Sequence, residues 1–141
     1  MKIILTNSKV EMQESMPSGT EVEIFPDFVN SDHPKSEGWY ISNAGYLRTN
    51  PTYVGKDGVS DLMPVFGYSK IKITGAVGNQ YWASWAFFTD AEDMVGSNSA
   101  VFRTAGDYEV DIPAGAVWVR FSQNGNSSGN VSPCRRFMIV K

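Results

Sequence analysis

The stretch Asp107–Gln123, which reads DYEVDIPAGAVWVRFSQ, decides the fold class. Every second residue is apolar before a Pro-Ala-Gly break, and the same alternation resumes after it. The apolar positions are Tyr108, Val110, Ile112, Val117, Val119 and Phe121. Period-two alternation on both sides of a turn is typical of two half-buried antiparallel strands. The sequence therefore predicts a β-hairpin here, at the centre of an all-β protein.

Strand patterns continue through the rest of the chain. Ser69–Thr74 alternates, with Ile71 and Ile73 expected to point inward and the lysines between them outward. Gln80–Phe88 is almost continuously apolar, as in a central strand covered on both faces. Other predicted strands are Lys2–Leu5, Glu21–Phe25, Gly38–Ser42, Tyr46–Arg48, Leu62–Phe66, Ala100–Arg103 and Arg135–Val140. No amphipathic helix of usable length is found, and roughly eight to ten short strands favour an antiparallel two-sheet β-sandwich of jelly-roll type.

Composition limits the class of protein. A chain of 141 residues fits one domain, and its net charge of −3 leaves no electrostatic footprint for nucleic acid or an anionic membrane. No apolar run approaches the ~20 residues of a membrane helix, and the apolar part of the N-terminus is too short for a signal peptide. We therefore expect folding in a cytoplasm. The single cysteine, Cys134, allows no internal disulfide and is expected to be a small buried residue beside the final strand.

Residues 1–35 differ from the rest of the chain. Their two short strand patterns are separated by a polar piece and followed by a dense set of turn formers. A two-stranded element is marginal alone, so it must pair with the sandwich, with another copy of the chain or with a different protein. We predict an N-terminal arm over residues 1–35, for assembly or docking, and a sandwich domain over residues 36–141. The alternative is that the arm supplies the first strands of the sandwich.

Seven segments occur in an order that resembles a known family: Gly38–Ser42, Gly45–Leu47, Ser60–Val65, Ser69–Gly75, Ala86–Asp90, Tyr108–Pro113 and Ala116–Ser122. The order is similar to that of β-sandwich modules in bacteriophage tail and head-fibre proteins and related carbohydrate-binding virion proteins. This resemblance implies a jelly-roll-like sandwich used for display and adhesion on a virion, often as a trimer. It implies no defined ligand residues.

No catalytic constellation is evident. The only histidine, His33, lies in a turn-rich segment, where a lone histidine is more often solvated or a capping residue. Asp90, Glu92 and Asp93 cluster, but acidic residues are expected in turns for backbone reasons. They could offer oxygens to calcium, although their spacing does not match an EF-hand loop, and a polar turn without a metal is the default expectation. We predict no enzymatic activity, no metal site and no cofactor.

One aromatic residue lies out of phase with the core pattern. Trp118 falls on the polar side of its strand together with Arg120, so the ring needs a second contact surface or a ligand. A flat ring can stack on the apolar face of a sugar, or it can pack against residues 1–35 or a neighbouring chain. The latter is favoured, since aromatic residues and arginine are enriched at interfaces. The candidate glycan or interface residues are Trp118, Arg120, Trp39, Tyr81 and Trp82, whereas Trp85 and Phe87 are assigned to the core.

These observations favour a non-enzymatic phage virion protein of the capsid-decoration, head-fibre or tail-fibre class. Its expected partners are other virion proteins and sister chains, and surface glycans are a further candidate ligand. Its expected location is the virion, after synthesis in the host cytoplasm. Deleting residues 1–35 should then abolish incorporation and leave the sandwich folded. The alternative is a soluble carbohydrate-binding module. A polysaccharide-degrading enzyme would require a converging pair of carboxylates, which a sequence does not reveal.

Overall fold

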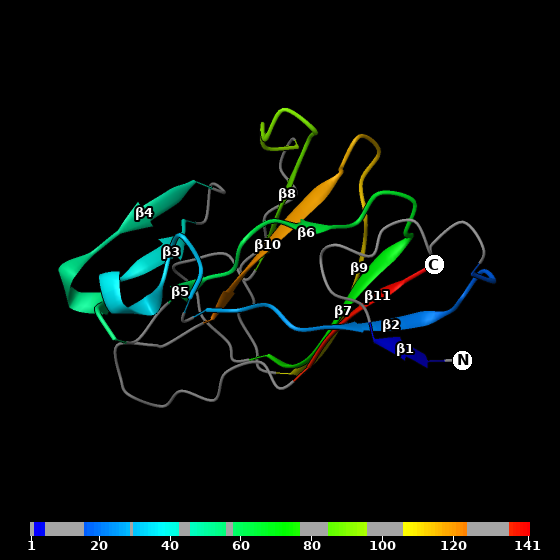
Figure 1. Ribbon diagram of the computed structural model, residues 1–141, viewed down its shortest axis with the longest axis horizontal. Helices are drawn as coiled ribbons and strands as arrows, with labels where there is room; N and C mark the ends of the chain where they lie inside the picture. Colours follow the sequence, from blue (N-terminus) through cyan, green and yellow to red (C-terminus); the bar gives the residue numbers. More distant parts are fainter. Residues whose placement is uncertain are drawn as a thin grey trace.

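The computed structural model describes residues 2–4, 16–28, 30–42, 46–55, 58–76, 85–95, 106–123 and 136–141. These residues form an all-β fold, as the alternation predicts, and its only helical elements are two short 3-10 turns, η2 (Lys35–Glu37) and η3 (Pro51–Tyr53). Figure 1 shows two neighbouring groups of strands, with a separate hairpin at one end. No helix in this part of the chain is long and apolar enough to cross a membrane.

The larger sheet has five strands. Their order is β1 (Lys2–Ile4), β2 (Glu21–Ile24), β11 (Arg136–Val140), β7 (Lys70–Ala76) and β9 (Gly106–Asp111). All neighbours are antiparallel except β1 and β2, which run parallel. The expected antiparallel pairing is thus confirmed for the other pairs of this sheet, and β1 at its edge is the exception. Strand β7 continues through Gly75 and Ala76, which the sequence assigned to a turn, with a register shift after Ile73.

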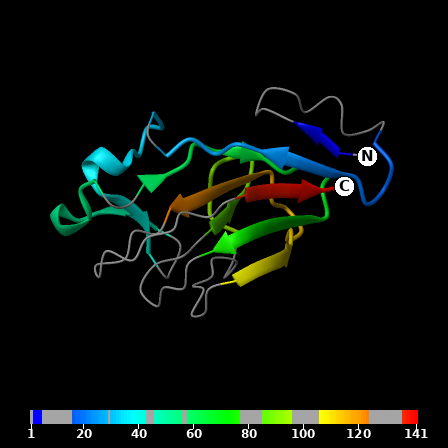
Figure 2. The same cartoon turned by 90° about the horizontal axis from the view of Figure 1, so that it is seen from below.

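The second sheet is built around β10 (Trp118–Gln123). It pairs antiparallel with β5 (Gly58–Val59) at one end, with β6 (Met63–Pro64) at the other, and with β8 (Trp85–Phe88) along its length. A separate hairpin of β3 (Trp39–Ile41) and β4 (Leu47–Thr49) lies at the end of the molecule away from β1 and β2 (Figures 1 and 2). The described strands thus form a sandwich-like fold, and its jelly-roll connectivity stays a prediction.

The main core lies between the two sheets. Alternation supplies Val22 and Ile24 from β2, Ile71 and Ile73 from β7, and Val119 from β10, and all five side chains are buried. Phe121 of β10 meets Phe137 of β11 with ring centroids 4.5 Å apart and a tilt of 57° between planes. This contact joins the sheets directly, because each ring belongs to a different one.

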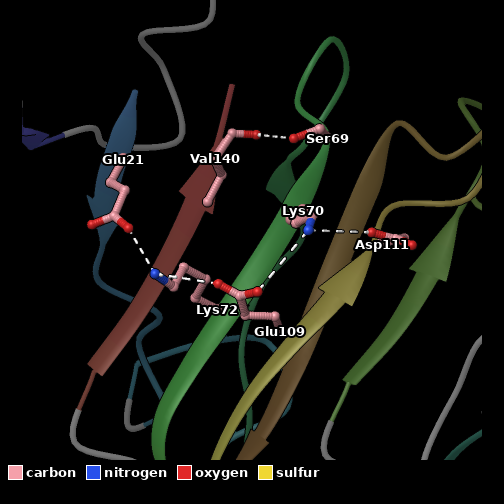
Figure 3. Close-up of polar contacts among 7 residues, drawn as sticks. All are labelled: Glu21, Ser69, Lys70, Lys72, Glu109, Asp111 and Val140. Atoms are coloured by element: carbon pink, nitrogen blue, oxygen red, sulfur yellow. Dashed lines mark hydrogen bonds and ion pairs between the residues drawn. The ribbon is translucent and has the colours of Figure 1, made fainter. Parts of the chain in front are cut away.

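Paired charges cover the outer face of the five-stranded sheet (Figure 3). Lys72 Nζ lies 2.7 Å from an oxygen of Glu21 on β2 and 3.4 Å from an oxygen of Glu109 on β9. Lys70 Nζ lies 4.0 Å from oxygens of both Glu109 and Asp111. The inward direction of Ile71 and Ile73, and the outward direction of the lysines, are thus confirmed. Each exposed pair contributes only about 0.2–1 kcal/mol to stability. The main effect of these charges is therefore to give the sheet a polar outer face, and their contribution to the free energy of folding is small.

The decisive stretch forms two strands, as predicted, but they do not pair with each other. Strand β9 pairs with β7 in the five-stranded sheet, whereas β10 pairs with β8 in the other sheet. The Pro-Ala-Gly break is therefore a corner between sheets and not the turn of a hairpin. Gly115 adopts a positive φ of 87° there, and the Ala116 N–H donates to the Pro113 carbonyl. Alternation alone identifies a strand but does not identify its partner.

Strand β2 pairs in register with β11 of its own chain. Val22 lies opposite Ile139, and Ile24 lies opposite Phe137. Strand β1 also pairs within the chain, because it adds in parallel to β2. This pairing agrees with the alternative in which residues 1–35 supply strands of the sandwich, and removing them would expose the hydrogen-bonding edge of β11. The domain boundary at residue 35 stays a prediction.

Several other strand predictions can be compared with the structure. The β3–β4 hairpin is confirmed, and Pro64 lies in an edge strand, as expected of proline. All four residues of β8 are buried, Trp85 and Phe87 included, although β8 has only β10 as a strand partner in the described residues. The predicted strand at 100–103, the start of the apolar run at 80–84, and Cys134 lie outside the described residues.

We expect Phe121→Ala to lower the free energy of unfolding by about 3–5 kcal/mol, because it removes a fully buried ring that joins the sheets. Urea denaturation measures the change. Phe66→Ala is the matched control, since 61% of Phe66 is exposed and the same truncation there should cost less than about 0.5 kcal/mol. Equal losses in the two variants would contradict the assignment of the core.

Candidate functional site

The face of β10 turned away from the main core carries the candidate site. Trp118, Arg120 and Ser122 alternate with the core residues of the strand, as the pattern predicted. The Trp118 ring packs against a second, smaller apolar cluster. Its fully or largely buried members are Ile41, Val59, Ala86 and Phe88, and Trp39, Leu47, Leu62 and Met94 pack around them. The second contact surface that Trp118 required is thus found within its own chain.

Arg120 is half-buried beside this cluster. Its Nη1 donates to the Ser60 carbonyl at 3.0 Å and lies 3.4 Å from His33 Nδ1, while the guanidinium carbon lies 5.9 Å from the centre of the Phe88 ring. Burial lowers the pKa of Arg120, and the nearby carboxylates of Asp61, Glu92 and Asp32 act against this effect. The guanidinium is therefore a fixed cation, anchored on one side and facing carboxylates.

Ser60 holds the neighbouring loop against β10. Its hydroxyl accepts the Phe121 N–H at 2.9 Å and donates to the Asp61 carbonyl at 2.9 Å, and its own N–H donates to the Phe121 carbonyl. Because Ser60 is fully buried, these bonds satisfy polar groups that water does not reach. They place the Asp61 side chain beside Arg120.

A second loop is attached to the first by further hydrogen bonds. The Ser31 hydroxyl donates to the Val59 carbonyl, the Val59 N–H donates to the His33 carbonyl, and the Asp32 N–H donates to Asp61 Oδ1 at 3.1 Å. Residues 31–33 thereby become a wall of the site. Arginine has no acceptor, so the Arg120 contact is a hydrogen bond when His33 Nδ1 is the unprotonated nitrogen.

Glu92 reaches the site from the turn after β8. The Thr89 N–H donates to the Asp93 carbonyl, and the Glu92 N–H donates to the Thr89 carbonyl, which closes a tight turn. Glu92 has a φ of 63°, a left-handed conformation that is uncommon for a residue with a side chain. In this turn the Glu92 side chain lies at the edge of the site.

These segments surround an open cleft of about 400 Å³. Its lining residues are Asp32, Asp61, Leu62, Glu92, Trp118 and Arg120. The cleft thus combines one aromatic ring, one anchored guanidinium and three carboxylates from four separate parts of the chain. Four of its six lining residues are charged, so the cleft is more polar than a typical small-molecule site, whose lining is mostly apolar.

The structure brings together only some of the residues proposed from sequence. Trp118 and Arg120 line the same cleft. Trp39 does not line it; its Nε1 donates to Glu37 Oε2 at 2.8 Å, and its ring meets the His33 ring edge-on, with centroids 4.5 Å apart. Trp39 is therefore linked to the cleft through His33 and Arg120. Tyr81 and Trp82 lie outside the described residues.

Four polar residues at the site were not identified by sequence reasoning. Asp32 and Asp61 look like ordinary turn residues, and Glu92 was considered only within the acidic cluster with Asp90 and Asp93. His33 was expected to be solvated or capping, but it is half-buried between Arg120 and Trp39. The one sequence signal for Asp32 and His33 was the run of turn formers from residue 26 to residue 34, which indicates a loop. Nothing in the local sequence indicated that this loop contacts β10. Among the residues that the structure describes, no three His, Cys, Asp or Glu side chains are arranged to hold a metal ion.

Comparison with known proteins gives no match: no family model, no curated protein and no solved structure is significantly similar to this chain. The resemblance to phage fibre modules accordingly stays a prediction from the order of sequence motifs.

We expect acid to destabilise the protein through His33. Burial, followed by the Arg120 charge, lowers the pKa of His33 below its ordinary value of 6.5, although Asp32, Asp61 and Glu37 act in the opposite direction. Between the lowered pKa and 6.5 the unfolded chain binds more protons than the folded one, so the free energy of unfolding falls as the pH decreases. At higher pH, His33 is neutral in both states and contributes no such loss.

Urea denaturation of the wild type and His33→Gln, at pH values from about 8 to about 5, measures this effect. Other groups titrate in both proteins, so the difference between them isolates His33. The variant should lose less stability on acidification. An equal loss in both proteins would show that the His33 environment does not disfavour protonation.

Proposed function

We propose that this protein is a non-enzymatic glycan-binding β-sandwich, and that the cleft at Trp118 holds the saccharide. The observation that carries the proposal is the combination of an aromatic ring, an anchored guanidinium and carboxylates in one open cleft. Carbohydrate binding, the alternative to a virion role, is thus the proposed activity of the sandwich.

The lining matches the chemistry of a sugar. A pyranose ring has apolar C–H faces, which pack on a flat aromatic surface, and a rim of hydroxyl groups that both donate and accept hydrogen bonds. Trp118 supplies the surface. Carboxylates only accept and the guanidinium only donates, so together they pair with both functions of the hydroxyls. Hydrogen bonds to charged groups are stronger than those between neutral groups.

The competing explanation for Trp118 was packing by residues 1–35 or by a neighbouring chain. From residues 1–35, Asp32 lies at the wall of the cleft beside Trp118. Asp32 is exposed and Trp118 is half-buried, so this segment borders the ring without closing the cleft. The ring therefore has both a packing role, against Phe88 and its neighbours, and an accessible side.

Three carboxylates at one cleft also bear on the possibility of a polysaccharide-degrading enzyme. Glycosidases use two carboxyl groups, one of them an acid kept protonated by an apolar environment. Asp32 and Glu92 are exposed to solvent, and Asp61 lies beside the Arg120 cation. This environment suits hydrogen-bond acceptors for a bound sugar better than a general acid. Incubation of the protein with its bound saccharide should therefore release no reducing ends.

The bacteriophage context comes from the resemblance in motif order alone. It would make the protein a virion component of a fibre or decoration structure, with the cleft available for adhesion to surface glycans. Sister chains and other virion proteins would be its partners. Light scattering of the purified protein addresses the oligomer: the fibre proposal expects a trimer of the 15.6 kDa chain, and a monomer would contradict it.

We expect Trp118→Leu to reduce saccharide affinity by at least about tenfold, since leucine keeps apolar volume against Phe88 but offers no flat ring. A glycan array identifies the saccharide, and calorimetry with that saccharide compares the variants. Trp118→Phe should retain part of the affinity. Phe66→Ala, at an exposed residue that does not line the cleft, is the control that should bind normally.

Urea denaturation of each variant separates binding from folding. If Trp118→Leu is folded and binds the saccharide as the wild type does, the cleft is not the site. If no saccharide on the array binds the wild type, the proposed function is wrong.

A further inference from the structure

The residues that line the cleft carry an unbalanced charge. Asp32, Asp61 and Glu92 contribute three carboxylates, and Arg120 contributes one guanidinium, so the lining has a formal charge of −2. His33 stands behind Arg120 and is neutral at pH 7, because its pKa lies below 6.5. Among the residues that the structure describes, no lysine lines the cleft.

The single cation among the described lining residues is set back from the opening of the cleft. Arg120 is half-buried, and its Nη1 is already directed at the Ser60 carbonyl and His33. Asp32 and Glu92 are exposed. A ligand that enters from solvent therefore meets carboxylates first, and the potential at the opening is negative.

The carboxylates are held where they are by separate contacts. Asp61 Oδ1 accepts the Asp32 N–H, which ties two of the carboxylate residues together. Glu92 is carried by the closed turn after β8. All three act electrostatically on Arg120, which places their charges around the same space. These three carboxylates form a negative rim around the cleft, and three separate segments of the fold position it.

This inference rests on the proposed function. We propose that the cleft selects saccharides by charge, binding neutral and amino sugars and rejecting sugars that carry carboxylate or sulfate groups. An ammonium group or a hydroxyl can donate to the rim carboxylates. An acidic group would lie beside like charges, and such juxtaposition excludes ligands efficiently. Trp118 holds the ring of the sugar, and the rim determines which substituents are accepted.

A glycan array with neutral, amino and acidic saccharides tests the proposal directly on the full chain. The expected result is that the bound saccharides belong to the first two classes. Calorimetry then compares the best saccharide with its form oxidised to a uronic acid at C6, which should bind at least about tenfold more weakly. Binding of the acidic form as tightly as the parent would overturn the proposal, although glycan binding itself would stand.

Two variants assign the selectivity to the rim. Glu92→Gln and Asp61→Asn keep shape and hydrogen-bonding atoms but each removes one negative charge. Each should lower the affinity for an amino saccharide by about fivefold, and should raise the affinity for an acidic one by a similar factor, because one charge at close range in water is worth about 1 kcal/mol. The preference should weaken in high salt.

Glu109→Gln is the matched control. It makes the same change in net charge on the outer face of the other sheet, where Glu109 pairs with Lys72, and it should leave the preference unchanged. If Glu109→Gln shifts the preference as much as Glu92→Gln does, total charge and not the rim is responsible. If no saccharide of any class binds, the proposed function is wrong. If acidic saccharides bind as well as neutral ones, only the charge selectivity is wrong.

Discussion

Strand β10 constrains the whole structure because both of its faces are in use. One face carries Val119 and Phe121 into the core between the sheets, where Phe121 meets Phe137 of the opposite sheet. The other face carries Trp118 and Arg120 to the second cluster and the cleft. Since side chains alternate strictly along a strand, a slip of one residue would exchange these two sets. The core and the site therefore share one register.

The cleft depends on a buried arrangement around Arg120. Desolvation opposes a half-buried cation, and the nearby carboxylates offset that cost. The Ser60 carbonyl and the Phe88 ring supply further contacts. The acidic residues at the rim thus have two effects: they stabilise the charge on Arg120, and they give the opening its negative potential. Removing one of them therefore alters both effects at once.

Local pattern was sufficient for much of the fold. Alternation located β7 and both strands of the decisive stretch, and it assigned Ile71 and Ile73 to the core and Trp118 to the opposite phase. It did not identify partners, since β9 and β10 join different sheets and β1 runs parallel to β2. Hydrogen-bond partners depend on contacts between distant segments, and the order of short strands along the chain does not specify them.

The same limit applies to the site. Trp118 and Arg120 could be named because they break a regular pattern, whereas Asp32 and Asp61 match the ordinary composition of turns. Their role arises from hydrogen bonds such as that between the Asp32 N–H and Asp61, which joins loops 29 positions apart. His33 was misjudged for the same reason, because its burial depends in part on Arg120, 87 positions away.

The pairing of β2 with β11 has a consequence for synthesis in the cell. Arg136 Nε of β11 contacts Glu23 Oε1 of β2 at 2.8 Å across 113 positions of sequence. While the chain grows on a ribosome, β2 must wait for more than a hundred residues before this neighbour exists. Until then Val22 and Ile24 have no sheet to join on that side, and the edge of β2 is open to other chains. Completion of the five-stranded sheet is therefore a late event in folding, and the period before it is when this chain is most exposed to misassembly.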